Sequence, residues 1–162
     1  ATATTTAITI TTTPRPRRKQ RSPGISERPG AAVAVSVKAS ALRASGGESK
    51  DFVAWLRDSD RNLYVGRRGR IFIHDGNGAK RIFHYPASKW QNPFAVAQGV
   101  TRQQVCDEYR AALSGGTLKD PADGRPLKDK LHELRGLRLG CWCKPEACHA
   151  DVLAALANSL PG

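Results

Sequence analysis

The sequence predicts a small α/β domain, in which a three- to four-stranded sheet carries packed helices and ends in a C-terminal strand–turn–helix. Three observations predict this class. Strand-like and helix-like patterns alternate along residues 51–160, two similar β-rich runs flank a turn signal, and a strict apolar alternation precedes the last helical pattern. The 162 residues fit one domain, and the absence of a long apolar run predicts no transmembrane segment.

The first half of this region predicts a helix, a strand and a hairpin. Asp51–Asp60 places apolar residues at helical spacing, and the following β-rich run stops at Gly66. The runs Arg70–His74 and Arg81–Tyr85 are separated by Asp-Gly-Asn-Gly, a strong turn sequence, which predicts a β-hairpin. Asn92 precedes a proline and is therefore disfavoured in the α region, so the segment around it is expected to be a loop.

The second half predicts three helices and one strand. Thr101 and Gln104 have the spacing of a capping box, and the helix that they begin ends at Ser-Gly-Gly. A second helix is expected between Pro126 and Gly136, with its leucines inward. Leu137–Cys143 then alternates as a strand whose cysteines share one face, and the last helix is expected over residues 147–160.

The N-terminal third differs in composition from the rest of the chain. Residues 1–47 are predicted to be a basic low-complexity extension, and residues 48–162 the α/β domain. Residues 1–50 hold nine Lys and Arg against two Glu, so they carry most of the formal charge of +12. An Arg- and Ser-rich, acid-poor N-terminus is typical of organellar transit peptides, and Val37-Lys38-Ala39 resembles an algal plastid processing context. The expected location is therefore an organelle, with the chloroplast preferred over the mitochondrion, while a basic anchoring arm is the alternative.

The remaining excess of positive charge gathers around the expected hairpin. Its basic residues could contact phosphates, which makes RNA a possible partner through the basic arm and the hairpin, although a charge run is more often a solvated face. The basic residues are Arg61, Arg67, Arg68, Arg70, Lys80 and Arg81.

The densest chemistry lies in Cys141-Trp-Cys143-Lys-Pro-Glu-Ala-Cys148-His149. Three interpretations compete. As a metal site, these three thiols and the imidazole are ligands that zinc prefers, so zinc is a possible cofactor. As a reactive site, Cys148 at a helix N-terminus would be a thiolate, with His149 or Asp151 orienting a proton or substrate. Otherwise the cysteines are small buried side chains beneath a core tryptophan.

Four blocks of the sequence together resemble the domain of unknown function 4326 family. They are the strand end at Gly66-Arg67, the loop Lys89-Trp-Gln-Asn-Pro-Phe94, the helix start at Thr101-Arg102, and Leu134–Leu153 with its Cys-Trp-Cys and Cys-His pairs. The resemblance covers about residues 63–160 and implies a fold and a site, but no reaction.

The candidate ligand-binding residues that the resemblance implies are Gly66, Arg67, Trp90, Asn92 and Arg102. The chain departs from the family pattern at Gln91 and Ala150, where glycine is usual. Because glycine permits close approach of a ligand to the backbone, these departures predict a narrowed or unused pocket.

Two functions therefore stay open. The first expectation is a non-catalytic accessory or structural subunit of an organellar assembly, such as a ribosome or a photosynthetic complex, with protein subunits as partners. The departures from glycine favour it, as does the hairpin, which is longer than the connection usual in the family. The alternative is an enzyme that binds a nucleotide or phosphate ligand and uses a Cys/His site, through a thiol or zinc.

Overall fold

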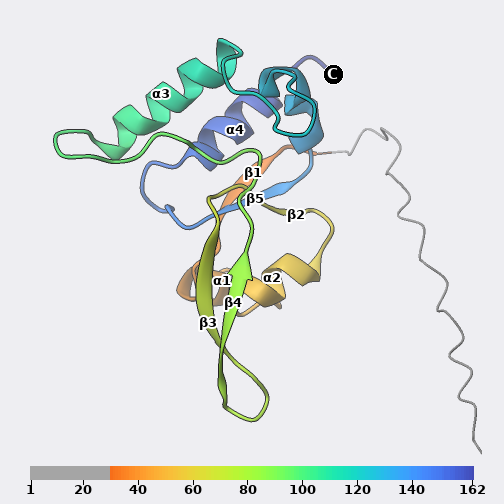
Figure 1. Ribbon diagram of the computed structural model, residues 1–162. Coiled ribbons are helices and arrows are strands. Elements are labelled where there is room, and N and C mark those ends of the chain that lie inside the picture. Colours follow the sequence, from red (N-terminus) through yellow and green to blue (C-terminus); the bar gives the residue numbers. More distant parts are fainter. Residues whose placement is uncertain (1–29) are drawn as a thin grey trace, which may run out of the picture.

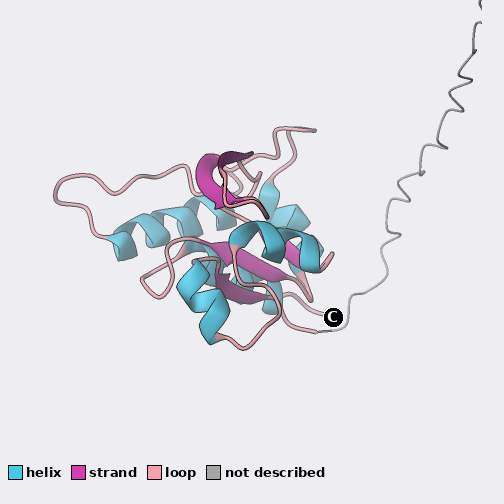
Figure 2. Cartoon of the chain, turned by 90° about the horizontal axis from the view of Figure 1, so that it is seen from below, coloured by secondary structure: helices cyan, strands magenta, loops and turns pink. Residues whose placement is uncertain are grey.

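The computed structural model describes residues 30–162, and its centre is a three-stranded parallel sheet (Figure 1). The strands are β1 (Val33–Ser36), β2 (Asn62–Tyr64) and β5 (Arg138–Cys141), in the order β1-β5-β2. Helices lie on either side of these strands (Figure 2), which confirms the α/β class. Because the strands are parallel, their carboxyl ends meet at one edge of the sheet.

The alternation of side chains along each strand divides the core into two clusters. Leu139 of the central strand β5 is paired with Ala34 and Leu63, and all three contact the larger cluster. The next rung places Gly140 between Val35 and Tyr64, which contact the smaller cluster on the opposite face. A period of two therefore gives each face of the sheet its own hydrophobic layer.

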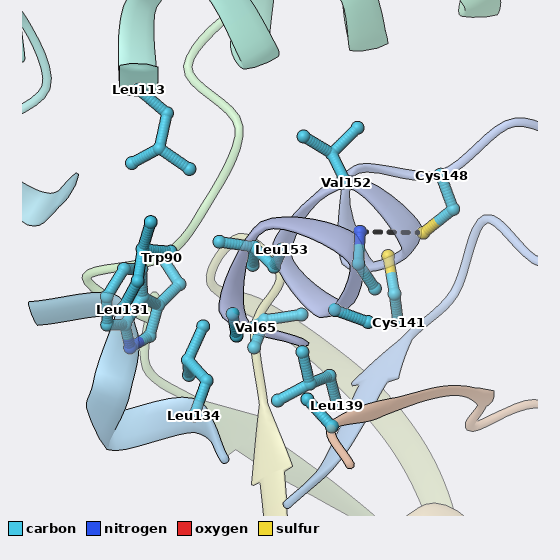
Figure 3. Close-up of a cluster of buried hydrophobic side chains, with 14 of the residues drawn as sticks. Val65, Trp90, Leu113, Leu131, Leu134, Leu139, Cys141, Cys148, Val152 and Leu153 are labelled. Carbon is cyan, nitrogen blue, oxygen red and sulfur yellow. Dashed lines mark hydrogen bonds between the residues drawn. The ribbon is translucent and has the colours of Figure 1, made fainter. Parts of the chain in front are cut away.

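The larger cluster is covered by three helical elements, α3 (Arg102–Ser114), η1 (Leu127–Leu134) and α4 (His149–Asn158). Their apolar faces meet Leu139 and Val65, both of which have no exposed surface (Figure 3). The element η1 is a 3₁₀ helix, whereas the sequence was expected to form an ordinary helix there. Its leucines are nevertheless buried, as predicted.

The smaller cluster lies under α1 (Ala39–Ala44) and α2 (Phe52–Asp58). The hairpin of β3 (Gly69–His74) and β4 (Lys80–Tyr85) packs its base against the same cluster and projects away from the sheet (Figure 1). The hairpin is confirmed, but it forms a separate two-stranded sheet.

The boundary predicted at residue 47 is corrected by β1 and α1. Val33–Ser36 pairs with β5 along its whole length, and Val37 and Leu42 are buried in the smaller cluster. Residues 31–47 therefore belong to the folded domain, and the processing-like motif at Val37 lies inside it. The Thr/Ala-rich and Arg/Pro-rich part of the predicted extension lies outside the described residues.

Side-chain hydrogen bonds hold the start of α3 and the loop before η1 in place. The capping box of α3 is confirmed, because Thr101 Oγ1 accepts a hydrogen bond from the backbone N–H of Gln104 at 3.2 Å and the Gln104 side chain accepts one from the N–H of Thr101 at 2.7 Å. In the loop before η1, the carboxylate of Asp120 accepts hydrogen bonds from Lys130 at 2.6 Å and Lys89 at 3.1 Å. The hydrogen bond from Lys130 is the main cause that holds the pKa of Asp120 well below its usual range.

The start of β1 is tied to the end of α4. The amide side chain of Asn158 accepts a hydrogen bond from the backbone N–H of Ala32 at 2.7 Å and donates one to its carbonyl at 2.9 Å. Within residues 30–162, no helix has the length and apolar character needed to cross a bilayer.

Candidate functional site

A pocket of about 470 Å³ opens at the carboxyl edge of the parallel sheet. Its walls come from the ends of β2 and β5, from the start of α3 and α4, and from the loop that contains Asn92. Open α/β sheets bind ligands in the crevice outside the carboxyl ends of their strands. The pocket therefore occupies the position at which a sheet of this type presents a ligand site.

The charge of the pocket is positive. Arg67, Arg68 and Arg102 line it, and none of the lining side chains contributed by residues 30–162 is acidic. Arg102 forms an ion pair with Glu146, and both side chains are about half exposed. Arg68 takes part in none of the ion pairs among the described residues, so its guanidinium is available to an anion.

Arg67 holds the loop that forms the pocket rim. Its Nε donates a hydrogen bond to the Asn92 carbonyl at 2.9 Å, and its terminal nitrogen donates to the carbonyl of Phe94. Asn92 itself is buried, donates from Nδ2 to the carbonyl of Val105 and accepts from the N–H of Phe94. Both predicted residues line the pocket, and their polar groups are largely used to shape it.

One wall of the pocket is aromatic. The ring centroids of Tyr64 and Tyr85 are 5.2 Å apart in an edge-to-face arrangement, and Trp142 lies 6.3 Å from Tyr85. Burial is the main cause that raises the pKa of the Tyr64 hydroxyl, which donates a hydrogen bond to the carbonyl of Arg67 at 2.8 Å. These rings give the pocket an apolar wall in addition to its arginines.

Gly66 has a steric role beside this wall. A Cβ atom there would lie 2.6 Å from the ring carbon of Tyr64 that bears its hydroxyl. Any side chain at this position would therefore displace the tyrosine ring. The glycine predicted as a ligand-binding residue thus lines the pocket and also permits the aromatic wall.

The three cysteines of the predicted block converge at the base of the pocket. The sulfur atoms of Cys141, Cys143 and Cys148 all lie within 4.8 Å of one another, and all three thiols are free. Strand alternation places the first two on one face of the chain. Cys148 caps the N-terminus of α4, where its sulfur accepts a hydrogen bond from the backbone N–H of Ala150 at 3.4 Å (Figure 3). Cys141 and Cys143 line the pocket, whereas Cys148 lies behind them.

The protonation of the three thiols is linked. The hydrogen bond from Cys141, followed by that from Cys148, lowers the pKa of Cys143 and favours its thiolate. The hydrogen bond with Cys143 is the main cause that raises the pKa of Cys141. The hydrogen bond with Cys141 is the main cause that raises the pKa of Cys148. The cluster therefore favours negative charge at the Cys143 sulfur.

His149 is buried beside this cluster. Its Nε2 lies 2.7 Å from the carbonyl oxygen of Val65, and its Nδ1 lies 3.9 Å from the sulfur of Cys141. Burial is the main cause that lowers the pKa of the ring. The neutral imidazole is therefore favoured, with Nε2 carrying the proton, because a carbonyl can only accept.

Two predicted site residues lie elsewhere. Trp90 is a core residue, 2% exposed, whose carbonyl accepts a hydrogen bond from the buried hydroxyl of Tyr109. Asp151 is exposed and pairs with Lys144 at 2.6 Å. Neither lines the pocket, and neither do Gln91 and Ala150, so the departures from glycine do not narrow it.

Sequence reasoning missed Tyr64 and Trp142 as parts of the site. Strand alternation predicts that Trp142, between Cys141 and Cys143, faces away from both, and it does lie against the smaller cluster. The pocket wraps around the end of the strand, however, and so reaches residues of both faces. The available signal was the position of both aromatics at the ends of neighbouring parallel strands.

Comparison with known proteins gives a family and two viral relatives. The family model described as "Domain of unknown function (DUF4326)" matches residues 53–159. An uncharacterized 12.4 kDa protein in the nrdA-td intergenic region of Enterobacteria phage T4 is 51% identical over 37 residues, which is 23% of this chain and 34% of the relative. Uncharacterized protein R718 of Acanthamoeba polyphaga mimivirus is 29% identical over 83 residues, 46% of this chain and 56% of the relative.

The chain thus spans about a third of one of these relatives and about half of the other. No solved structure matches it.

Proposed function

The chain belongs to the DUF4326 family, whose description assigns no activity, and we propose that its pocket binds an anionic ligand that carries phosphate and an aromatic ring, as a nucleotide does. The observation that carries this proposal is the lining of the pocket. Among the described residues, three arginines and no carboxylate line the pocket, together with a wall of three aromatic rings.

The arginines suit the phosphate part of such a ligand. A guanidinium presents several N–H donors in a planar fork that matches phosphate oxygens. The guanidinium of Arg68 forms no ion pair among residues 30–162. Arg102 forms one, with the exposed carboxylate of Glu146, which a phosphate would have to replace. Because that pair is exposed, replacing its carboxylate by a phosphate costs little.

The aromatic wall suits the ring part. Tyr64, Tyr85 and Trp142 offer apolar surface at which a base can be shielded from water.

Binding should depend on the two available arginines. We expect Arg68→Ala and Arg102→Ala each to weaken binding of a nucleoside 5′-monophosphate about tenfold or more, because a hydrogen bond to a charged group contributes about 1.5–3 kcal/mol. Glu146→Gln should strengthen binding, since it frees Arg102. Isothermal titration calorimetry with nucleoside phosphates, inorganic phosphate and unphosphorylated nucleosides measures these effects.

The matched control is Arg110→Ala. Arg110 is exposed on the same helix as Arg102 and does not line the pocket, so its loss should leave the affinity unchanged. Failure of every phosphorylated compound to bind would contradict the proposal. Equal weakening by Arg110→Ala would show that only net charge matters, which also contradicts it.

A second candidate function, as an accessory subunit of an organellar assembly such as a ribosome or a photosynthetic complex, is favoured by the exposed face of the hairpin. Three cross-strand pairs form this face, namely Arg70 with His84, Phe72 with Ile82, and His74 with Lys80. Phe72 is 64% and Ile82 49% exposed, and none of the six residues is acidic. A cationic face with an exposed ring suits RNA, whose phosphates and bases it would contact.

This second candidate predicts that Phe72→Ala weakens RNA binding by the full chain. Stacking of one base on an aromatic side chain contributes about 1–3 kcal/mol, so the loss should be about fivefold or more. Fluorescence anisotropy with labelled single-stranded RNA at several salt concentrations measures it. Val33→Ala, which removes a comparably exposed apolar side chain from β1, should have no effect. Equal affinity of the Phe72→Ala protein would exclude the hairpin as the contact.

The organellar location stays a prediction. It rests mainly on residues 1–29, which lie outside the described residues.

A further inference from the structure

We propose that Cys141, Cys143 and Cys148 bind a Zn²⁺ ion as thiolates, with Nδ1 of His149 as the fourth donor. This inference does not depend on which ligand occupies the pocket. It rests on the spacing of the three sulfur atoms, on the contact between Nδ1 of His149 and the Cys141 sulfur, and on the hydrogen bond that orients the imidazole.

The three sulfur atoms have the spacing that one ion requires. In a tetrahedral site with Zn–S bonds of about 2.3 Å, the sulfur atoms are about 3.8 Å apart. The sulfur atoms of Cys141, Cys143 and Cys148 lie within 4.8 Å of one another, so small side-chain rotations bring all three onto one ion. Cys106, the fourth cysteine of the chain, lies on α3 and is not part of this group.

The imidazole of His149 presents its free nitrogen to the Cys141 sulfur, and a shift of the ring would bring it within reach of an ion held by all three thiolates. Since Nε2 donates to the Val65 carbonyl at 2.7 Å, the lone pair of the neutral ring is on Nδ1. That nitrogen lies 3.9 Å from the Cys141 sulfur, close to the roughly 3.6 Å expected between nitrogen and sulfur ligands of one zinc ion. Zinc-binding histidines commonly donate their other N–H to a carbonyl or a carboxylate, which fixes the ring in this way.

The chain geometry explains how adjacent Cys148 and His149 can both reach the ion. Cys148 is the N-cap of α4 and has an extended backbone, whereas His149 is the first residue inside the helix. Because the backbone conformation changes between the two residues, their side chains are not held to the spacing of neighbours within one helix.

The surroundings suit the charge of the filled site. Three thiolates and one Zn²⁺ ion carry a net charge of −1, and the N-terminus of α4 stabilises negative charge at its first turn. With four protein donors the tetrahedron is complete, which is the arrangement of structural zinc sites. The ion would therefore fix the end of β5 to the start of α4 and so hold one wall of the pocket.

The first experiment measures the metal in the full chain, purified under reducing conditions. We expect one equivalent of zinc by inductively coupled plasma mass spectrometry, and its loss in Cys143→Ser. Cys106→Ser is the matched control, because it removes a buried thiol outside the cluster and should keep the zinc. Chelation should lower the melting temperature of the unmodified protein and of Cys106→Ser, and leave that of Cys143→Ser unchanged.

Titration of the unmodified metal-free protein with Co²⁺ requires no variant and guards against misfolding of Cys143→Ser. A thiolate-to-cobalt charge-transfer band that saturates at one equivalent and is displaced by Zn²⁺ supports the site. Absence of the band from folded, reduced protein, or zinc that persists in Cys143→Ser, would overturn it.

The fourth donor is tested by X-ray absorption at the zinc edge. We expect three sulfur ligands and one nitrogen with the outer scattering of an imidazole, and loss of that scattering in His149→Asn. Three sulfur ligands and a water oxygen in the unmodified protein would overturn the assignment of His149, and four sulfur ligands would overturn the site as described.

Discussion

Leu139→Ala is expected to lower the free energy of unfolding by about 2–5 kcal/mol. Leu139 lies on the central strand β5 and has no exposed surface. Its removal would leave a cavity between the sheet and α4, where neighbouring strands and helices hold the backbone in place and limit collapse. Urea unfolding followed by circular dichroism measures the change.

The comparison for this variant is Val33→Ala. Val33 is 51% exposed on the edge strand β1, so its truncation should cost less than about 1 kcal/mol. A similar loss for the two variants would show that the larger cluster is not the main source of stability, in conflict with the burial of Leu139.

Gly140→Ala is expected to lower the free energy of unfolding by about 1–3 kcal/mol. Its effect acts on the opposite face of the same strand. An added Cβ would lie 2.5 Å from the Trp55 ring and 2.6 Å from a Val37 methyl group, distances that force both side chains to move. The effect is therefore overpacking of the smaller cluster, whereas Leu139→Ala leaves a void in the larger one. The same urea experiment measures it.

Gly76→Ala is the matched control for this variant. A Cβ there would meet no atom within 4 Å, so the hairpin turn should accept it with little change. In the double variant Val37→Ala with Gly140→Ala, one clashing group is absent and the combined cost should fall below the sum of the single costs. Additive costs would contradict the proposed clash.

The sequence predicted best those elements whose signals are local. The capping box at Thr101 and the turn of the β3–β4 hairpin depend on residues close to one another in the chain, and both are confirmed. The alternation of β5 is confirmed because Leu139 and Gly140 do face different clusters. Each of these features carries its cause within a few residues.

Features that depend on distant partners were missed. The run before Val37 was assigned to the low-complexity extension, because the segment around it is small, hydroxylated and basic. A strand of a parallel sheet, however, can be built from a short apolar run without the alternation that marks a strand in a sequence. Only pairing with β5, about a hundred residues later in the chain, shows that Val33–Ser36 is a strand.

The candidate site was predicted in part for the same reason. Gly66, Arg67, Asn92 and Arg102 line the pocket, and their role in binding a ligand stays a prediction of the family resemblance. Trp90 was included for its place in the motif, but its ring fills the core. Asp151 follows the Cys-His pair in sequence, yet the turn of α4 directs it to solvent and to Lys144. At the start of α4, therefore, closeness in sequence to Cys148 and His149 did not predict closeness to the pocket.

The hydrogen-bonded pair of Ala32 and Asn158 has a consequence for any larger assembly. Ala32 precedes β1, so the chain enters the domain at the amino edge of the parallel sheet, whereas the pocket opens at the carboxyl edge. A tether attached before Ala32 would therefore leave the pocket mouth pointing away from whatever holds the tether. The entry of the chain and the mouth of the pocket lie at opposite edges of the sheet, so attachment at the first would leave the second uncovered.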